Sequence, residues 1–394
     1  MKKGWQTKHL GDVAAVGAGN SAPQDEALFE DGTIPFFRTA DAGRVRFGDI
    51  AESTDYLNDK GVKGLRRFAA GTILFPKSGA STFLNHRVIL GVEGCVSSHL
   101  ATIVADEKQA HPRFLLYFLS TIEAQDLVQD HAYPSLNLPT IAGIEVHLPP
   151  LAEQQRIVGL LDEAFEGLAT AKANAKKNLQ NARALFESHL RFVLRSKKWK
   201  WKTLGDLCDD VEYGSSAKSK AKGGVPVLRM GNIQDGRLEW DNLVYTDDKA
   251  EIKKYLLKHN DVLFNRTNSP ELVGKTAVYK GEMPAIFAGY LIRIHRKEDL
   301  LDADYLTYFL NSQIAFDYGK TVVISSVNQA NINGTKLKNY PIPAPSLLEQ
   351  TAIVAKLNEL SEETQRLARL YERKLGALEA LKKSLLHQAF TGEL

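Results

Sequence analysis

The stretch PPLAEQQRIVGLLDE, residues 149–163, places a proline pair, a Glu-Gln pair and an Ile-Val pair at the start of a long run of mixed polar and apolar residues. A second stretch, APSLLEQTAIVAKLNEL at 344–360, repeats this order. Behind each stretch, apolar or small residues recur at steps of three and four, the spacing of one helix face. No proline interrupts either run. We therefore expect two helices of about 40 residues each, far longer than the usual globular helix.

The two expected helices differ at their starts and along their apolar faces. Ser346 and Glu349 form an S-x-x-E capping box, whereas Pro150 stands where Ser346 would be in the first copy. The apolar face of the first run is rich in alanine, and that of the second is rich in leucine. Small side chains facing large ones favour a close antiparallel coiled coil of the two helices.

The rest of the chain is also written twice. In chain order, IPFFR (34–38) matches VPVLR (225–229), GTILFPKS (71–78) matches NDVLFNRT (260–267), and HPRFLLYFLST (111–121) matches DADYLTYFLNS (302–312). Short apolar runs broken by Gly, Pro, Asn and Asp predict strands, and the RFLLYFL and YLTYFL segments predict one helix in each copy. A duplicated half-protein, one globule followed by one long helix, is the simplest interpretation.

The predicted fold class is two α/β (α+β) globules, related by a pseudo-twofold axis and separated by two long antiparallel coiled-coil helices. The predicted segments are a globule at 1–150, a central long helix at 151–196, a second globule at 197–345 and a C-terminal long helix at 346–394. Because the second helix begins where the second globule ends, it runs back along the first helix. The C-terminus is therefore expected near the N-terminal globule.

Composition and motifs exclude several classes of protein. The 394 residues are 44% hydrophobic and 25% charged, with a net charge of +3, which is typical of a soluble globular protein. No apolar run is long enough to span a bilayer, and two cysteines make no disulfide framework, so a cytoplasmic location is expected. No Walker A loop, no histidine spacing typical of metal sites and no amino-methyltransferase tetrapeptide occurs. A non-catalytic binding scaffold remains.

Two globules alternating with two long helices, with PPLAEQQRIV and APSLLEQTAIV at the helix starts and LLHQAFTGEL (385–394) at the end, resemble the specificity subunit of Type I restriction-modification enzymes. The resemblance covers essentially the whole chain. It implies that each globule is a target recognition domain that reads one half of a bipartite, asymmetric site on double-stranded DNA. The helices would set the unread gap and dock two methyltransferase subunits, through which the restriction subunits join. S-adenosylmethionine, ATP and Mg are expected only on those partners, so this chain needs no cofactor.

Matched positions at strand ends supply the candidate DNA contacts. Lys77 and Ser78 stand where Arg266 and Thr267 stand in the second copy, with Asn268 beside them. A basic residue beside a hydroxyl at a strand end is typical of phosphate or base-edge contact. The arginine matches the O6/N7 edge of guanine in bidentate fashion, and the lysine matches a phosphate.

Further candidates follow the same symmetry. Strand-end arginines, basic loop residues and one matched aromatic pair make up the set: Arg38, Arg229, Arg66, Arg67, Lys218, Lys220, His99 and Tyr290. For the cationic residues the alternative is an ordinary solvent-facing charge, and for His99 and Tyr290 the alternative is buried packing. Gln154 and Gln350 are candidates for contact with a partner subunit.

Two other functions remain open from the sequence. A coiled-coil adaptor that holds two protein-binding globules would have the same architecture, without any preference for DNA sequence. A single-chain restriction or modification enzyme would show turnover by the purified chain alone.

Overall fold

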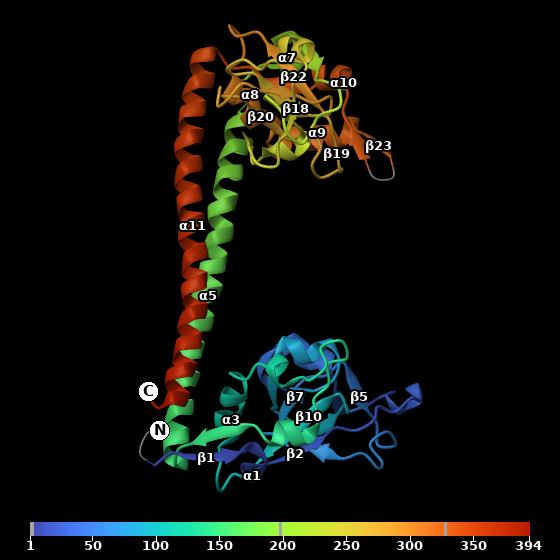
Figure 1. Cartoon of the computed structure of the whole chain (residues 1–394), viewed down its shortest axis with the longest axis vertical. Coiled ribbons are helices and arrows are strands. Elements are labelled where there is room, and N and C mark those ends of the chain that lie inside the picture. The colour runs from blue at the N-terminus through green and yellow to red at the C-terminus, as the bar shows by residue number, and fades with distance from the viewer. Residues whose placement is uncertain (1–3, 197–198, 327–328) are drawn as a thin grey trace. The chain divides into compact units, whose positions relative to one another are not determined.

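The computed structural model describes residues 4–196, 199–326 and 329–394. The chain forms two compact units, of which unit 1 comprises Met1–Asn174 with Lys374–Leu394 and unit 2 comprises Ala175–Arg373. The two expected long helices are present as α5, Leu151–Leu194, and α11, Leu347–Thr391 (Figure 1). The compact units differ from the predicted chain segments because each globule packs against stretches of both helices.

Unit 1 has a globule built on two mixed sheets. The five-stranded sheet has the order β2-β10-β7-β8-β4 and the four-stranded sheet the order β5-β3-β9-β6, while β1 pairs with β11. The strands are β1 (Gln6–His9), β2 (Ala14–Ala18), β3 (Ile34–Phe37), β4 (Phe47–Ile50), β5 (Asp55–Leu57), β6 (Arg67–Phe68), β7 (Ile73–Pro76), β8 (Arg87–Leu90), β9 (Gly94–Val96), β10 (Leu100–Ala105) and β11 (Glu145–Leu148). The helices are α1 (Leu10–Val13), α2 (Thr39–Val45), α3 (Pro112–Leu119) and α4 (Leu138–Ala142), with short 3-10 turns at Glu26–Leu28, Ala80–Leu84 and Ala124–Leu127.

Unit 2 repeats this plan with smaller sheets. The orders are β13-β22-β18-β20, β17-β14-β21, β19-β24-β23, β15-β16 and β12-β25. The strands are β12 (Trp201–Thr203), β13 (Cys208–Tyr213), β14 (Val225–Leu228), β15 (Ile233–Gln234), β16 (Arg237–Leu238), β17 (Val244–Thr246), β18 (Val262–Asn265), β19 (Thr267–Asn268), β20 (Thr276–Val278), β21 (Ile286–Phe287), β22 (Leu291–Arg296), β23 (Ile324–Ser326), β24 (Gln329–Asn331) and β25 (Pro341–Pro343). The helices are α6 (Leu204–Leu207), α7 (Lys249–Tyr255), α8 (Ala303–Leu310), α9 (Gln313–Val322) and α10 (Gly334–Lys338), with a 3-10 turn at Met230–Asn232.

The strand registers make the duplication visible. In unit 1, β7 pairs with β8 so that Ile73 faces Ile89. In unit 2, β18 pairs with β20 so that Val262 faces Val278. The sequence-predicted helices of the two globules appear as α3 and α8. The two copies therefore share one strand arrangement as well as sequence matches.

The long helices run antiparallel within each unit. In unit 1 Arg156 Nη2 donates to the carbonyl oxygen of Leu394 at 2.8 Å, and Lys172 forms an ion pair with Glu379. In unit 2 Arg183 pairs with Glu372 at 2.8 Å. The C-terminal residues thus belong to unit 1, as the sequence predicted.

The apolar faces predicted from helical spacing are only partly buried. On these faces Ala175 and Ala182 are buried, but Leu185 and Leu381 are 50% and 48% exposed. Helical spacing alone does not distinguish a residue at the centre of the helix interface from one at its margin.

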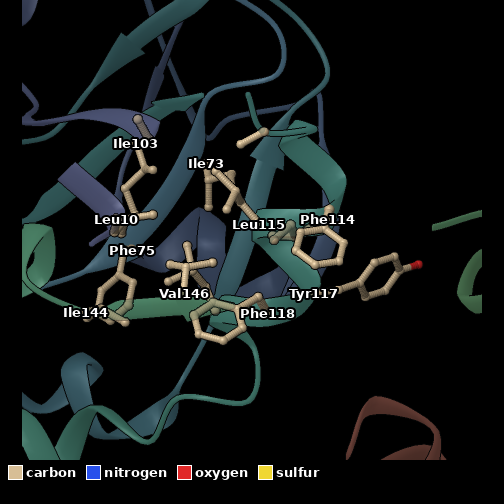
Figure 2. Close-up of a cluster of buried hydrophobic side chains, with 14 of the residues drawn as sticks. Leu10, Ile73, Phe75, Ile103, Phe114, Leu115, Tyr117, Phe118, Ile144 and Val146 are labelled. Atoms are coloured by element: carbon tan, nitrogen blue, oxygen red, sulfur yellow. The ribbon is translucent and has the colours of Figure 1, made fainter. Parts of the chain in front are cut away.

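The core of each globule continues into the helices. In unit 1, buried residues of β7, β10, α3 and β11 form one cluster (Figure 2). The same cluster takes in Ile157 and Leu161 of α5 and Ala389 of α11. Tyr117 lies at the edge of this cluster (Figure 2), and its hydroxyl donates to Asp162 of α5. In unit 2 the corresponding cluster takes in Leu190 of α5 and Leu357 of α11. Burial of this shared apolar surface attaches each globule to the helix pair.

The Glu-Gln pair of the opening stretch has a structural role in unit 1. Gln154 is fully buried. Its Oε1 accepts from the backbone N–H of His111 at 2.8 Å, and its Nε2 donates to the carbonyl oxygens of Gln109 at 2.9 Å and Pro149 at 2.8 Å. His111 is the N-cap residue of α3. One side chain therefore joins the start of α5 to the start of the globule's main helix.

Gln350 makes the same three bonds in unit 2. It is also fully buried, and it bonds the N–H of Asp302 and the carbonyls of Leu300 and Pro345 at 2.8, 2.8 and 2.9 Å. Asp302 is the N-cap of α8. We call the contacts of Gln154 and Gln350 the glutamine clamps.

The glutamine clamps correct one prediction from the sequence. Gln154 and Gln350 were candidates for contact with a partner subunit, and that assignment is wrong because both amides are buried and bonded within their own unit. The neighbouring capping box is confirmed: Ser346 Oγ donates to Glu349 Oε2 at 2.7 Å, and the N–H of Ser346 donates to the same oxygen at 2.9 Å.

Unit 2 also holds a buried ionic network. Arg293 of β22, 7% exposed, pairs with Glu212 at 2.5 Å and with Asp261 at 3.0 Å. Burial alone would raise the pKa of Glu212, but the hydrogen bonds and positive charge of Arg293, with His295 beside it, outweigh burial and hold that pKa below its usual 4.5. The network therefore stabilises unit 2 only while this carboxylate is ionised.

None of the helices in residues 4–196, 199–326 and 329–394 is both long and apolar enough to cross a lipid bilayer.

The glutamine clamps predict a large difference between adjacent glutamines. Gln154→Ala leaves an N–H and two carbonyl groups buried without partners, so we expect it to lower the free energy of unfolding by about 3 kcal/mol. Gln155→Ala, at an exposed neighbouring position, should change it by less than about 0.5 kcal/mol. Urea denaturation of the full chain measures both. Equal midpoints for the two variants would show that the clamp contributes nothing.

The ionic network predicts a pH-dependent loss of stability. Arg293→Met removes the guanidinium from two poorly solvated carboxylates and leaves His295 beside Glu212, and it should destabilise unit 2 by about 3 kcal/mol at pH 7. Because the Glu212 pKa is depressed in the folded state, the wild type keeps this contribution above about pH 4.5 and loses it as pH falls further. The difference between wild type and variant in urea denaturation should shrink below pH 4.5. Arg237→Met, at an exposed position, is the control.

Candidate nucleic-acid interface

The first candidate position lies at the end of β7 in unit 1. The backbone N–H of Lys77 donates to the carbonyl oxygen of His99 at 3.0 Å, and the Lys77 carbonyl accepts from the N–H of Leu136 at 2.8 Å. The Lys77 side chain is half-buried, and that of His99 is exposed. Two side chains predicted from the sequence are thus brought together on adjoining segments.

The matched position in unit 2 has the same backbone bonds. Arg266, after β18, donates its N–H to the carbonyl oxygen of Tyr290 at 3.0 Å and accepts from Ile332 at 2.9 Å. Tyr290 is 48% exposed. The pairing of Lys77 with His99 and of Arg266 with Tyr290 is therefore a property of the repeated fold. The alternative that His99 and Tyr290 serve buried packing is wrong, since both rings are open to solvent.

The guanidinium of Arg266 has several neighbours that the sequence comparison did not identify. Its Cζ lies 4.8 Å from the ring centroid of Tyr213, Nη1 donates to the carbonyl of Gly289 at 3.2 Å, and Nη2 lies 3.4 Å from Oδ1 of Asn331. Tyr213 and Asn331 come from β13 and β24, far apart in the chain. The sequence does hold a signal for Tyr213, because the two copies differ there: the matched position in the first copy is Ala18.

Three neighbouring candidates have different surroundings. Thr267 is only 7% exposed, and its hydroxyl accepts from Nδ2 of Asn331 at 2.8 Å, so its assignment as a DNA contact is wrong. Ser78 is half-buried and forms a β-bridge with Ser135. Asn268 is half-buried, and its Oδ1 accepts from the N–H of Ser269 at 2.9 Å. Only the last two remain partly open to a ligand.

The strand-end arginines are matched in backbone but not in side-chain contacts. The N–H of Arg38 donates to Asp41, and that of Arg229 donates to Asn232. The Arg38 guanidinium forms an ion pair with Asp55 and lies 5.1 Å from the Phe36 ring. Arg229 is exposed. Arg38 must therefore give up part of an existing ion pair before it can bind an anion, whereas the exposed Arg229 donates from Nη2 to the carbonyl oxygen of Asn242 at 2.8 Å.

Two basic residues of unit 1 lie on the surface at the start of β6, where Arg66 precedes the strand and Arg67 is its first residue. Arg66 and Arg67 are both exposed. Arg66 places its Cζ 4.9 Å from the Phe68 ring, and Arg67 pairs with Glu93 at 3.3 Å. Exposed pairs of this kind contribute little to stability, so both cations remain able to exchange partners.

The basic loop of unit 2 precedes β14. Lys218 and Lys220 are exposed, and Lys220 lies 3.2 Å from Asp247. The N–H of Gly224, together with Lys220, lowers the pKa of Asp247. The carboxylate therefore stays ionised and partly neutralises this loop.

Within the residues that the structure describes, no group of three or more His, Cys, Asp or Glu side chains is placed to hold a metal ion. The candidate residues are cations, amides and aromatic rings at strand ends and in loops. This arrangement suits contact with a polyanion and its base edges.

Comparison with known proteins gives a consistent family. The family model described as Type I restriction modification DNA specificity domain matches residues 2–180 and again residues 196–372. The StySPI specificity subunit of Salmonella potsdam is 23% identical over 100% of this chain and 90% of its own length. The MjaX subunit of Methanocaldococcus jannaschii, a putative specificity subunit, is 30% identical over 197 residues. This stretch covers 49% of this chain and 45% of that relative's length.

Solved structures show the same fold. A chain from a study of assembly and conformational transition of the type I R-M system matches 100% of this chain and 99% of its own, with a TM-score of 0.78 at 20% identity. The HsdS subunit from Thermoanaerobacter tengcongensis matches 100% and 98%, with a TM-score of 0.64 at 19% identity. This chain therefore belongs to the type I restriction-modification DNA specificity family and carries two copies of the family domain. That class consists of DNA-recognition subunits rather than enzymes.

The different burial of residues at the candidate interface predicts that their substitutions change the free energy of unfolding by different amounts. His99→Ala and Tyr290→Ala remove exposed rings, so each should change the free energy of unfolding by less than about 0.5 kcal/mol. Thr267→Val keeps the size of the side chain but removes the acceptor for the Asn331 amide, and should cost about 1 kcal/mol. Urea denaturation of the three variants measures the difference. A destabilising His99→Ala or a neutral Thr267→Val would contradict the environments described above.

Proposed function

We propose that this chain gives a type I restriction-modification complex its sequence specificity by reading one half of a bipartite, asymmetric DNA site with each globule. The observation that carries the proposal is the matched pair of strand-end positions. The same backbone arrangement presents Lys77 with His99 in unit 1 and Arg266 with Tyr290 in unit 2. Equal scaffolds with unequal side chains suit two half-sites of different sequence.

We divide the candidate residues into phosphate contacts and base contacts. Arg66, Arg67, Lys218 and Lys220 are exposed cations, and we assign them to phosphates, which position the protein on the duplex. His99, Tyr290 and Arg266 are assigned to bases or sugars. Arg38 and Arg229 end matched strands and border the same surfaces.

The long helices supply the second part of the proposal. Both α5 and α11 are continuous through the two units, so we propose that their length sets the unread gap and that their outer surfaces dock two methyltransferase subunits. Restriction subunits would join through those partners. S-adenosylmethionine, ATP and Mg would be held by the partner subunits, and the complex would act on DNA in the cytoplasm.

The test uses this chain assembled with its methyltransferase subunits and a random DNA library. We expect enrichment of two separate half-sites with a constant gap. Affinity should fall by about 0.9 log unit per log unit of salt for each phosphate contacted. Two heptads added to each long helix should change the gap and leave both half-sites unchanged.

Three results would contradict the proposed function. Flat salt dependence without any enriched sequence would favour an adaptor that binds proteins. Methylation or cleavage by the purified chain alone would show a catalytic protein. Enrichment of altered half-sites in the helix variants would refute the division of labour between globules and helices.

A further inference from the structure

The guanidinium of Arg266 is held from several directions before any ligand is present. The Tyr213 ring lies 4.8 Å from Cζ, and the Gly289 carbonyl accepts from Nη1 at 3.2 Å. Asn331 Oδ1 lies 3.4 Å from Nη2. A flexible arginine loses considerable rotamer entropy on binding, so contacts that orient it in advance reduce that loss.

The residues that hold Arg266 are themselves fixed in place. The Tyr213 hydroxyl accepts from the N–H of Gly334 at 2.7 Å, at the first residue of α10. A Cβ at Gly334 would lie 2.8 Å from Val211 Cγ2 and 3.2 Å from the Tyr213 hydroxyl, so the close approach requires glycine. Asn331 donates its amide to buried Thr267 at 2.8 Å. Residues of β13, β19 and β24 therefore fix the orientation of the Arg266 guanidinium.

The held arginine keeps donors for a ligand. A guanidinium has five N–H groups, and Arg266 gives one from Nη1 to Gly289 and one from Nη2 to Asn331. Each terminal nitrogen therefore retains one further hydrogen. Two parallel N–H donors match the O6 and N7 acceptors of guanine, a pairing that specifies this base in the major groove.

The first globule lacks this arrangement. The strand registers place Ala18 against Ala101 in β2–β10 as they place Tyr213 against Ile292 in β13–β22. A methyl group thus replaces the tyrosine ring, and Lys77 replaces Arg266. A lysine ammonium is a mobile point charge without a planar fork.

We propose that Arg266 reads a guanine in the half-site of unit 2, with Tyr213 and Asn331 as the positioning residues that make this reading selective, and that unit 1 has no equivalent reader at Lys77. This inference rests on the proposed function and adds which base one position of one half-site carries. Thr267, wrongly assigned as a DNA contact, becomes part of the support for Asn331.

The experiment compares library enrichment by complexes containing wild type, Arg266→Lys, Arg266→Ala, Tyr213→Leu and Asn331→Ala. In Arg266→Lys, the preference for guanine at one position of one half-site should fall by about 5- to 150-fold. This range is the discrimination that one bidentate pair provides. Tyr213→Leu and Asn331→Ala should reduce the preference for guanine at the same position, but to a smaller extent. The other half-site should stay unchanged in all four variant complexes.

Tyr213→Phe is the matched control. It keeps the ring under the guanidinium and removes only the hydroxyl that accepts from Gly334, so it should retain most of the guanine preference that Tyr213→Leu loses. Urea denaturation of each variant separates loss of selectivity from loss of folding. A merely structural tyrosine would weaken binding to all sequences equally and would leave the enriched motif intact.

The outcomes separate this inference from the proposed function. If the wild-type complex enriches no sequence, the proposed function itself fails. If the wild type enriches a bipartite motif and Arg266→Ala enriches the same motif with a salt slope lower by about 0.9, Arg266 contacts a phosphate and the inference is wrong. An unchanged motif in Arg266→Lys would refute it as well.

Discussion

The architecture of both halves depends on one buried amide at the start of each long helix. Gln154 and Gln350 each satisfy one N–H and two carbonyl groups that would otherwise be buried without partners. An unpaired buried backbone group costs on the order of 1–3 kcal/mol, so these bonds discourage any other docking of globule on helix. Because the N-cap residues of α3 and α8 are among the partners, the clamps align the main helix of each globule with the long helix that follows it.

Beyond the clamps, the two halves have diverged in how they use the same backbone. Where β8 of unit 1 has Arg87, fully buried against the Phe75 ring, β20 of unit 2 has Thr276. Burial lowers the pKa of Arg87 to about 9. Where unit 2 buries Arg293 with its carboxylates, unit 1 has Thr102. Duplication therefore preserved strand register and hydrogen bonding, while charge was redistributed differently in each core.

Much of the fold and part of the candidate site were predictable. Helical spacing, proline position and the Ser346 capping box predicted the long helices, and the repeat predicted that Lys77 and Arg266 would occupy matched strand ends. Which polar side chains are exposed to solvent could not be predicted from the sequence. Gln154 is a polar residue near a helix start, which usually lies on the surface, yet three backbone groups from two segments, at 109–111 and at Pro149, surround it. Thr267 was assigned wrongly for the same reason.

The sequence by itself determined the duplication, the long helices and the family, because these depend on local periodicity and on the order of motifs along the chain. Only the tertiary structure decided which polar side chains face solvent. It also brought Tyr213 and Asn331 to Arg266, from strands separated by long stretches of chain. The physical reason is that burial and hydrogen-bond partners are set by segments that meet in space, and a linear pattern carries no information on which segments those are.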